Sequence, residues 1–224
     1  VKNKKITALV TTGPTREYLD PVRFISNESS GKQGYEVALA LSKLGIKTTL
    51  IAGPSKINFS KDIKTKNVTS GTEMMNKVKS SLPVDIAICA AAVSDFKPLT
   101  REREKMKKKH SNFTTIKLEK NLDILEFLGK NNKLRPKIVV GFSAETENII
   151  ENSTIKLRDK HCDLIIANDV SNKNVGFNVD FNKVSIIDKS GKILSIPKNK
   201  KSFIASKIAK RILEEFFTDG KNIN

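Results

Sequence analysis

The 224-residue sequence contains no tryptophan, only two cysteines and two histidines, and aromatic residues make up just 6% of it. Cys89 and Cys162 lie in apolar, strand-like segments, and His110 and His161 each follow a lysine. These four residues lack the sequence spacing of a metal site, so we expect both thiols to be reduced and buried in a cytosolic protein. The scarcity of aromatic residues also argues against the base-stacking surface of an RNA-binding domain.

Long apolar runs are missing as well. No segment approaches the ~18 consecutive apolar residues that a membrane-spanning helix requires. The apolar run that follows the N-terminal lysines is short, ends at Gly13-Pro14 and has no small-residue cleavage site, so we interpret it as a strand and not as a signal peptide. We therefore expect a cytoplasmic protein that does not associate with membranes. Because the sequence begins with Val1 and not with Met, we expect a processed or excised chain.

Acidic residues are in the minority, since 41 lysines and arginines outnumber 24 aspartates and glutamates and give a formal net charge of +17. One interpretation is a nucleic-acid partner, because basic surfaces bind phosphates without regard to sequence. The other is a lysine-rich composition with a local pocket for a small polyanion. The basic residues are spread along the whole chain and no helix-turn-helix pattern is visible. We favour the second interpretation and expect no specific nucleic-acid binding.

Apolar, strand-like segments alternate with helical patterns along the chain. We expect a helix that Thr72 caps and a C-terminal hairpin whose turn is the Lys-Ser-Gly segment. Because parallel strands need helix-length connections, this order predicts one α/β domain over residues 1–224, with a Rossmann-like, mainly parallel sheet and helices on both faces. The expected strands are 6–11, 47–52, 64–68, 85–91, 137–142 and 163–168, the hairpin is 183–196, and the expected helices are 31–44, 72–81, 121–129, 146–160 and 202–217.

Small, polar or glycine-bearing residues follow four of the expected strands, at 11–13, 90–92, 141–143 and 167–169. In open parallel sheets, ligands bind outside the carboxyl ends of the strands. Such residues are suited to form the floor of a crevice. The sequence therefore predicts a nucleotide-sized site at this edge of the sheet.

The stretch FISNESSGKQGYEVALALSKLG, residues 24–45, places a polar, glycine-bearing loop directly before a helix. It matches neither the Walker A pattern nor the dinucleotide fingerprint G-x-G-x-x-G. Gly31 and Gly34 nevertheless permit close backbone approach, and the free N–H groups of the helix start, with Lys32 beside them, favour an anion. Asn27 adds an amide that can donate to a carbonyl or phosphoryl oxygen. The alternative is a capped loop without a ligand.

Two further segments are rich in basic residues. The proline-stiffened GPTREYLDPVR contains Arg16 and Arg23, whose guanidinium groups suit a carboxylate or phosphate. Residues 94–117 are charged, basic and without periodicity, and we expect a mobile flap over the end of the strand at 85–91. Lysine and arginine in such a flap would stabilise a transferring phosphoryl group. The alternative is a solvated charged loop.

The motifs TTGPTREYLDPVRFISNESSGKQG, CAAAVSDFKP, EKMKKK, KNLDILEFL, VVGFSAET and DLIIANDVS…GFN follow one another in order. Together they closely resemble bacterial-type phosphopantothenate–cysteine ligase of coenzyme A biosynthesis, from about residue 5 to residue 217. The resemblance implies a Rossmann-like homodimer that joins 4′-phosphopantothenate to L-cysteine with CTP and Mg²⁺. It implies a 4′-phosphopantothenoyl-CMP intermediate, with release of pyrophosphate and then of CMP.

The resemblance also implies roles for individual residues. Lys105 would stabilise transition-state charge and contact CTP, and Asn27 and Arg23 would handle the activated acyl group, with Ser30, Gly31 and Lys32 binding the same substrate. No protein side chain is implied as a metal ligand, since the triphosphate would hold Mg²⁺. The implied CTP contacts besides Lys105 are Cys89, Ala90, Ala91, Asp95, Leu122, Asp123, Ile124, Leu125, Phe142, Lys156 and Lys160.

In most bacteria this ligase follows a flavin-dependent decarboxylase domain, which this sequence does not contain. We therefore expect either a stand-alone ligase or half of a bifunctional protein, and no FMN in this chain. Two other classes stay open. One is a nucleotide-sugar or dinucleotide-dependent enzyme on the same fold, which tight binding of NAD(P)H would support, although no acidic residue ends the second strand. A nucleic-acid-binding protein would bind DNA at sub-micromolar affinity in ~150 mM salt.

Overall fold

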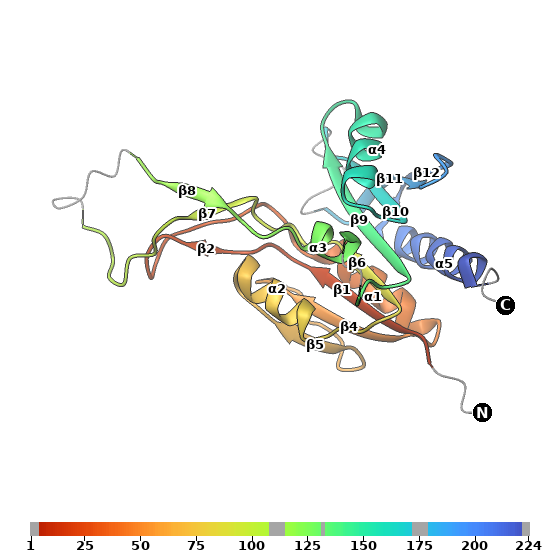
Figure 1. Ribbon diagram of the computed structural model, residues 1–224, viewed down its shortest axis with the longest axis horizontal. Coiled ribbons are helices and arrows are strands. Elements are labelled where there is room, and N and C mark those ends of the chain that lie inside the picture. Colours follow the sequence, from red (N-terminus) through yellow and green to blue (C-terminus); the bar gives the residue numbers. More distant parts are fainter. Residues whose placement is uncertain (1–4, 108–114, 131–132, 172–178, 221–224) are drawn as a thin grey trace.

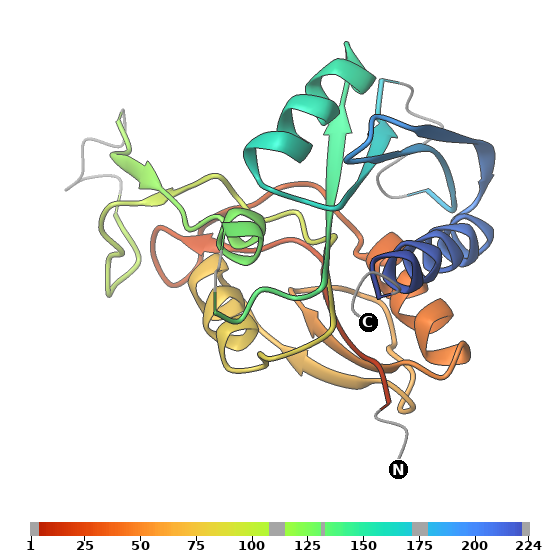
Figure 2. The same ribbon diagram turned by 45° about the vertical axis from the view of Figure 1, so that its right-hand side comes forward.

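The computed structural model describes residues 5–107, 115–130, 133–171 and 179–220. Its centre is an eight-stranded sheet in the order β12-β11-β10-β9-β6-β1-β4-β5 (Figure 1 and Figure 2). Strand β11 runs antiparallel to both of its neighbours, β10 and β12, and all other pairs are parallel. The predicted sheet and hairpin are thus confirmed. The strands are β1 (Thr7–Thr12), β4 (Lys47–Ala52), β5 (Lys64–Asn67), β6 (Ile86–Cys89), β9 (Ile138–Glu145), β10 (Leu164–Asp169), β11 (Phe181–Asp188) and β12 (Ile193–Lys200).

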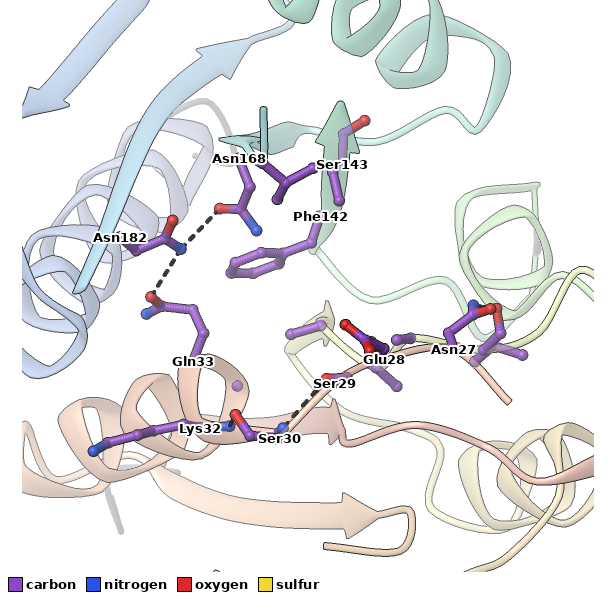
Figure 3. A pocket seen from close by; sticks show the side chains of 18 of the residues that line it. Asn27, Glu28, Ser29, Ser30, Lys32, Gln33, Phe142, Ser143, Asn168 and Asn182 are labelled. Carbon is purple, nitrogen blue, oxygen red and sulfur yellow. Dashed lines mark hydrogen bonds between the residues drawn. The ribbon is translucent and has the colours of Figure 1, made fainter. Parts of the chain in front are cut away.

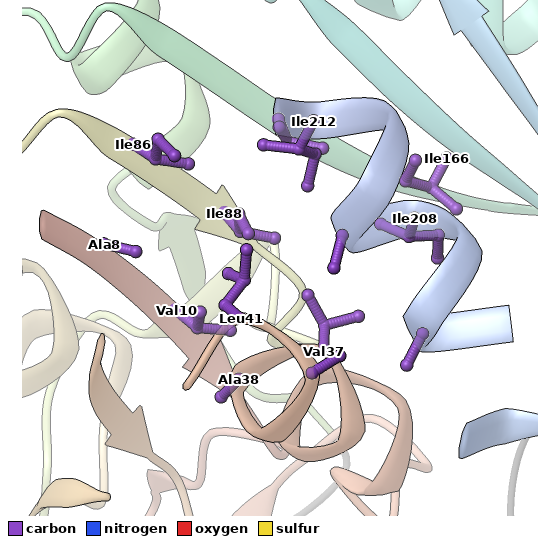
Figure 4. Packing of buried hydrophobic residues seen from close by; sticks show 14 of the residues in the cluster. Ala8, Val10, Val37, Ala38, Leu41, Ile86, Ile88, Ile166, Ile208 and Ile212 are labelled. Atoms are coloured by element: carbon purple, nitrogen blue, oxygen red, sulfur yellow. The ribbon is translucent and has the colours of Figure 1, made fainter. Parts of the chain in front are cut away.

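Helices cover both faces of the sheet, because the central strands are apolar on both sides. Along β1, Ala8 and Val10 point into one hydrophobic cluster and Leu9 into the other. Helices α1 (Lys32–Lys43) and α5 (Lys201–Gly220) cover the first face, where Leu41 and Ile208 are fully buried (Figure 4). Burial of each such side chain contributes about 1.5–3 kcal/mol. The second face is covered by α2 (Gly71–Lys79), α3 (Ile124–Lys130) and α4 (Ile149–Asp159).

Three predicted helices begin later or earlier than their patterns indicate. Ser70, and not Thr72, caps α2, because the Ser70 hydroxyl accepts from the backbone N–H of Glu73. Helix α3 begins only at Ile124, because the carboxylate of Asp123 caps it by accepting from the N–H of Glu126. Helix α4 begins at Ile149, since the preceding strand β9 continues beyond its predicted end.

Two short antiparallel ribbons extend from the carboxyl edge of the sheet, where the sequence predicted only loops (Figure 1). One pairs β2 (Glu17–Tyr18) with β3 (Phe24–Ile25), and the other pairs β7 (Phe96–Pro98) with β8 (Leu118–Lys120). The predicted basic flap is therefore the extension of the β7–β8 ribbon. Residues 108–114 of this flap, which include His110, lie outside the described residues. We call these two ribbons and their described loops the arm. In the described residues, every helix is too short or too polar to cross a bilayer.

Candidate functional site

The crevice lies where the strand order reverses. From β1 the chain continues to β4 and β5 on one side, and it then returns to place β6 on the other side of β1. Two adjoining cavities of about 570 and 610 Å³ open here, at the carboxyl ends of β1, β6, β9 and β10. The two cavities therefore lie at the edge of the sheet where the sequence predicted a crevice. Open α/β sheets bind their ligands at this edge.

The first cavity, which we call the α1 pocket, lies above the start of α1 (Figure 3). Gly31 precedes the helix with a φ of 78°, which favours glycine, and the Thr12 hydroxyl donates to its carbonyl oxygen over 2.6 Å. A Cβ on Gly34 would lie 2.5 Å from that hydroxyl oxygen, so the helix packs against β1 only because residue 34 is glycine. The α1 pocket is lined by residues 26–34, 90–93, 95, 142–144, 156, 168, 170, 182 and 201.

The sequence suggested free N–H groups at the start of α1, but the structure shows that two of them are already bonded. The hydroxyls of Ser29 and Ser30 accept from the N–H groups of Gly31 and Lys32, over 3.2 and 3.3 Å. The Lys32 ammonium pairs with the carboxylate of Asp180 at 2.5 Å, and this pair lowers the pKa of Asp180. An anion in this pocket would therefore replace hydroxyl partners that the loop itself supplies.

A buried lysine closes the far side of the α1 pocket. Lys201 is the first residue of α5, and only 3% of its surface is exposed. Burial, together with the nearby charge of Lys32, lowers the pKa of Lys201 to about 8. The pocket therefore contains a third lysine besides Lys32 and Lys156, which sequence analysis did not identify and which loses its charge a little above neutral pH.

A row of three amide side chains forms one wall of the α1 pocket, and Figure 3 shows it. The amide nitrogen of Asn182 on β11 donates to the side-chain oxygens of Gln33 and Asn168, over 3.3 and 3.1 Å. Asn182 is 1% exposed, whereas the other two amides reach the cavity surface. Such a row can present a fixed hydrogen-bonding pattern to a bound molecule.

The second cavity, which we call the α3 pocket, lies between α3 and α4. Lys156 of α4 and Lys160, which caps the end of that helix, both line it. Lys160 is already paired, at 2.9 Å, with the carboxylates of both Asp123 and Glu126, and hydrogen bonds from Lys130 and Lys160 lower the pKa of Glu126 to about 2. Lys156 lines both pockets and has no ion-pair partner among the described residues. The α3 pocket is lined by residues 11, 89, 91, 93–96, 120–126, 142, 152, 155, 156, 159 and 160.

Both cysteines are free thiols, as expected. Cys162 is buried and Cys89, at the end of β6, is half-buried. Burial raises the pKa of Cys89, and it raises the pKa of Cys162 to about 12. Neither thiol is therefore a thiolate near neutral pH, so neither is suited to act as a nucleophile.

The structure separates the implied site residues into the two pockets. Asn27, Ser30, Gly31 and Lys32 line the α1 pocket, together with Ala90. The other implied CTP contacts, apart from Lys105, line the α3 pocket. Five residues border both cavities, so that two ligands bound side by side would meet there. These shared residues are Ala91, Val93, Asp95, Phe142 and Lys156.

Arg23 and Lys105 line neither pocket. Both lie on the arm, where the Arg23 guanidinium donates to the backbone oxygen of Met106, next to Lys105. Sequence analysis missed Gln33, Asn182 and Lys201 as site residues, and it placed Asn168 at the crevice floor without assigning it a role. The position of Asn168 at a strand end was a usable signal.

The geometry defines a Rossmann-like α/β domain whose two adjoining pockets, at the carboxyl edge of the sheet, can hold two ligands in contact. Residues 2–216 match the family model described as DNA/pantothenate metabolism flavoprotein C-terminal domain, and the chain belongs to this family. The chain is 40% identical over 209 residues to the coenzyme A biosynthesis bifunctional protein CoaBC of Vibrio cholerae, and 40% identical over 212 residues to that of Borreliella burgdorferi. These matches cover 92% and 94% of the chain but 52% of each relative, so the chain spans about half their length.

Solved structures agree with this assignment. The crystal structure of the C-terminal domain of a CoaBC protein superimposes with a TM-score of 0.79 at 34% identity, over 96% of both chains. A Cab2 mutant solved in complex with phosphopantothenate-cysteine superimposes with a TM-score of 0.75 at 17% identity, covering 96% of this chain and 89% of that one. The second likeness is one of fold alone.

Proposed function

We propose that this chain is a phosphopantothenate–cysteine ligase of coenzyme A biosynthesis that uses CTP. The observation that supports this most directly is the pair of adjoining pockets. The residues implied for CTP line one pocket, apart from Ala90 and Lys105, and those implied for the acyl substrate line the other, apart from Arg23. Phe142 and Lys156 border both. In this assignment, the α3 pocket binds the cytidine nucleotide and the α1 pocket binds 4′-phosphopantothenate.

The proposed reaction has two steps. The carboxylate of 4′-phosphopantothenate attacks the α-phosphorus of CTP, forming the acyl–phosphate bond of 4′-phosphopantothenoyl-CMP and breaking the bond to pyrophosphate. The amine of L-cysteine then attacks the acyl carbon, CMP leaves, and the amine loses its proton. Because each pocket holds one reactant, proximity accounts for much of the catalysis. The ammonium of Lys156, which has no ion-pair partner in the described part of the chain, borders both pockets and would stabilise the negative charge that accumulates between the reactants.

Magnesium fits this assignment as a companion of the nucleotide. Among the described residues, no three histidine, cysteine, aspartate or glutamate side chains gather into a metal site. Asp95 nevertheless borders both pockets and offers one carboxylate. Mg²⁺ is commonly bound through one or two carboxylates together with substrate phosphates. When bound, it would neutralise phosphate charge, and Asp95 would orient the phosphates through it.

We further propose that the chain acts as a homodimer that associates through the arm. Apolar side chains that are 40–57% exposed gather there, although the arm has no core of its own to cover them. Exposed apolar groups of this kind mark protein interfaces. A second copy would both bury them and bring Arg23 and Lys105 beside a pocket that their own subunit does not complete. These apolar residues are Val22, Phe24, Phe96, Leu99 and Leu118.

The bifunctional relatives suggest the setting of the reaction. A flavin-dependent phosphopantothenoylcysteine decarboxylase, as a fused domain or a separate partner, would consume the product of this site. FMN would then belong to the decarboxylase and not to this chain. We propose that both steps take place in the cytoplasm.

The test is pyrophosphate release from CTP and Mg²⁺ in the presence of 4′-phosphopantothenate, with and without L-cysteine and with ATP in parallel. We expect pyrophosphate only when the acid is present, and CMP with 4′-phosphopantothenoylcysteine only when cysteine is added. Stronger release from ATP would contradict the nucleotide assignment. A folded protein that releases no pyrophosphate from either nucleotide would refute the proposed activity.

A further inference from the structure

The row of three amides in the α1 pocket is anchored by the backbone at its central residue, Asn182, and at one end, Gln33. Asn182 accepts at Oδ1 from the N–H of Lys183 over 2.9 Å, and Gln33 donates from Nε2 to the carbonyl oxygen of Lys201 over 3.3 Å. With its two donated bonds to Gln33 and Asn168, Asn182 has used both N–H groups and its oxygen. A buried amide with every group satisfied has one orientation.

These anchors decide which way each amide faces. The backbone N–H of Lys183 requires an oxygen, so Asn182 must turn its NH₂ group toward Gln33 and Asn168. Asn168 must then show its oxygen to Asn182 and its own NH₂ group to the other side. Figure 3 shows that nitrogen on the side of Phe142, within the pocket. Among the described residues, no group accepts a hydrogen bond from it.

We propose that Asn168 donates a hydrogen bond from Nδ2 to an acceptor oxygen of the acid substrate, and that Asn182 acts as a positioning residue that holds this donor toward the pocket. The inference rests on the proposed function, which places 4′-phosphopantothenate in the α1 pocket. Asn182 touches no ligand itself, because it is 1% exposed and its polar groups are already bonded.

An isosteric change reverses the pattern. In Asn182→Asp the side chain keeps its shape but can only accept hydrogen bonds. The oxygen of Asn168 would then face a carboxylate, so the Asn168 amide must flip and present its oxygen to the pocket. The substrate oxygen would meet an acceptor and not a donor. The hydrogen bond to the substrate would thus be lost because one amide reverses its direction, and no cavity would be created.

The experiment measures the KM values for 4′-phosphopantothenate and for CTP in the pyrophosphate-release assay. We compare wild type, Asn168→Ala, Asn182→Asp and the double variant. Loss of one hydrogen bond to a charged group corresponds to about tenfold in the KM for the acid. We expect this rise in both single variants, with the KM for CTP within about twofold of wild type. Asn76→Asp, the same chemical change on the exposed side of α2, is the matched control and should change neither value.

The double variant separates positioning from a structural role. If Asn182 acts through Asn168, Asn182→Asp adds no further rise once Asn168 is alanine. Additive effects, an unchanged KM for the acid in Asn168→Ala, or a rise in the KM for CTP alone would each overturn the inference. Asn168→Ala decides the question even where Asn182→Asp fails to fold. Wild-type turnover distinguishes the two failures, since an inactive wild type refutes the proposed function first.

Discussion

The Arg23 guanidinium donates to the backbone oxygen of Met106 over 3.0 Å, and so joins the β2–β3 ribbon to the basic segment that carries Lys105. Buried Asp20 reinforces this junction. Although burial raises its pKa, hydrogen bonds from the N–H groups of Val22, Met106 and Arg23 hold that pKa below its ordinary value. Although Arg23 and Lys105 are far apart in the sequence, they therefore belong to one structural unit.

Lys105→Gln should reduce turnover by about 10²- to 10³-fold, the usual cost of removing one group that stabilises transition-state charge. Lys105 is exposed and lies at the tip of the described arm, so the fold should be unchanged. Turnover numbers and circular dichroism spectra test both points. Arg103→Gln removes one positive charge from the same segment and serves as the control. Near-normal turnover in Lys105→Gln would remove this lysine from the mechanism.

The proposed dimer predicts that Leu99→Asp combined with Leu118→Asp produces a monomer. Both side chains are about half exposed on the arm, at 52% and 46%, and a carboxylate in an apolar interface is costly to bury. Light scattering after size-exclusion chromatography measures the mass. Ile193→Asp, on the outer strand of the C-terminal hairpin, tests the alternative interface. Dissociation by Ile193→Asp alone would assign the contact to the hairpin.

The two lysines of α4 should differ in their importance for CTP. Lys156 has no ion-pair partner among the described residues, whereas Lys160 would have to leave Asp123 and Glu126 to reach a phosphate. We expect Lys156→Met to weaken CTP binding about tenfold and Lys160→Met to weaken it less. Isothermal titration at one fixed salt concentration measures both. Equal losses would mean that CTP displaces the carboxylates from Lys160.

Asn27→Asp should damage turnover more than CTP affinity. The Asn27 amide donates to the backbone oxygen of Val93 over 3.1 Å at the mouth of the α1 pocket. Aspartate cannot donate and adds a negative charge beside the acyl phosphate, so its effect should exceed that of Asn27→Ala. The comparison uses kcat and the dissociation constant of CTP for both variants. A loss confined to CTP binding would place Asn27 in the nucleotide subsite.

The central sheet could be predicted from the sequence because its inner parallel strands β1, β6, β9 and β10 are largely buried on both faces and therefore appear as apolar runs. The strand ends at 90–92 and 141–143 were identified for the same reason, and the structure brings them together at the crevice. Glycine at 31 and 34 was interpreted as permitting close approach of the backbone to an anion, which stays a prediction. The structure shows a different use of Gly34, which lets α1 pack against Thr12 of β1.

The arm and the amide row could not be predicted, because both depend on contacts between distant segments. Strands β7 and β8 are three residues each and pair across a long charged segment that has no periodicity. Asn182 lies on the same buried side of β11 as Val184 and Ile186, next to an irregularity in the β11–β12 register, and so occupies a position typical of an apolar residue. A single asparagine between Phe181 and Lys183, just before the predicted hairpin, gives no sign in the sequence of its bonds to Gln33 and Asn168.

Lys201 gives the chain a stability that depends on pH above neutrality. Its pKa is about 8 in the native protein and 10.5 when unperturbed, so between these values the unfolded chain binds more protons at this group. Stability therefore rises with pH across that interval. Lys201→Met removes the cost of burying the charge, and it should be more stable than wild type by on the order of 3 kcal/mol at pH 7. Above pH 10.5 the advantage should vanish. Urea unfolding of wild type and Lys201→Met at pH 7 and pH 10.5 measures this difference in stability. If the stabilities of both proteins changed with pH in parallel, Lys201 would titrate normally in the folded protein.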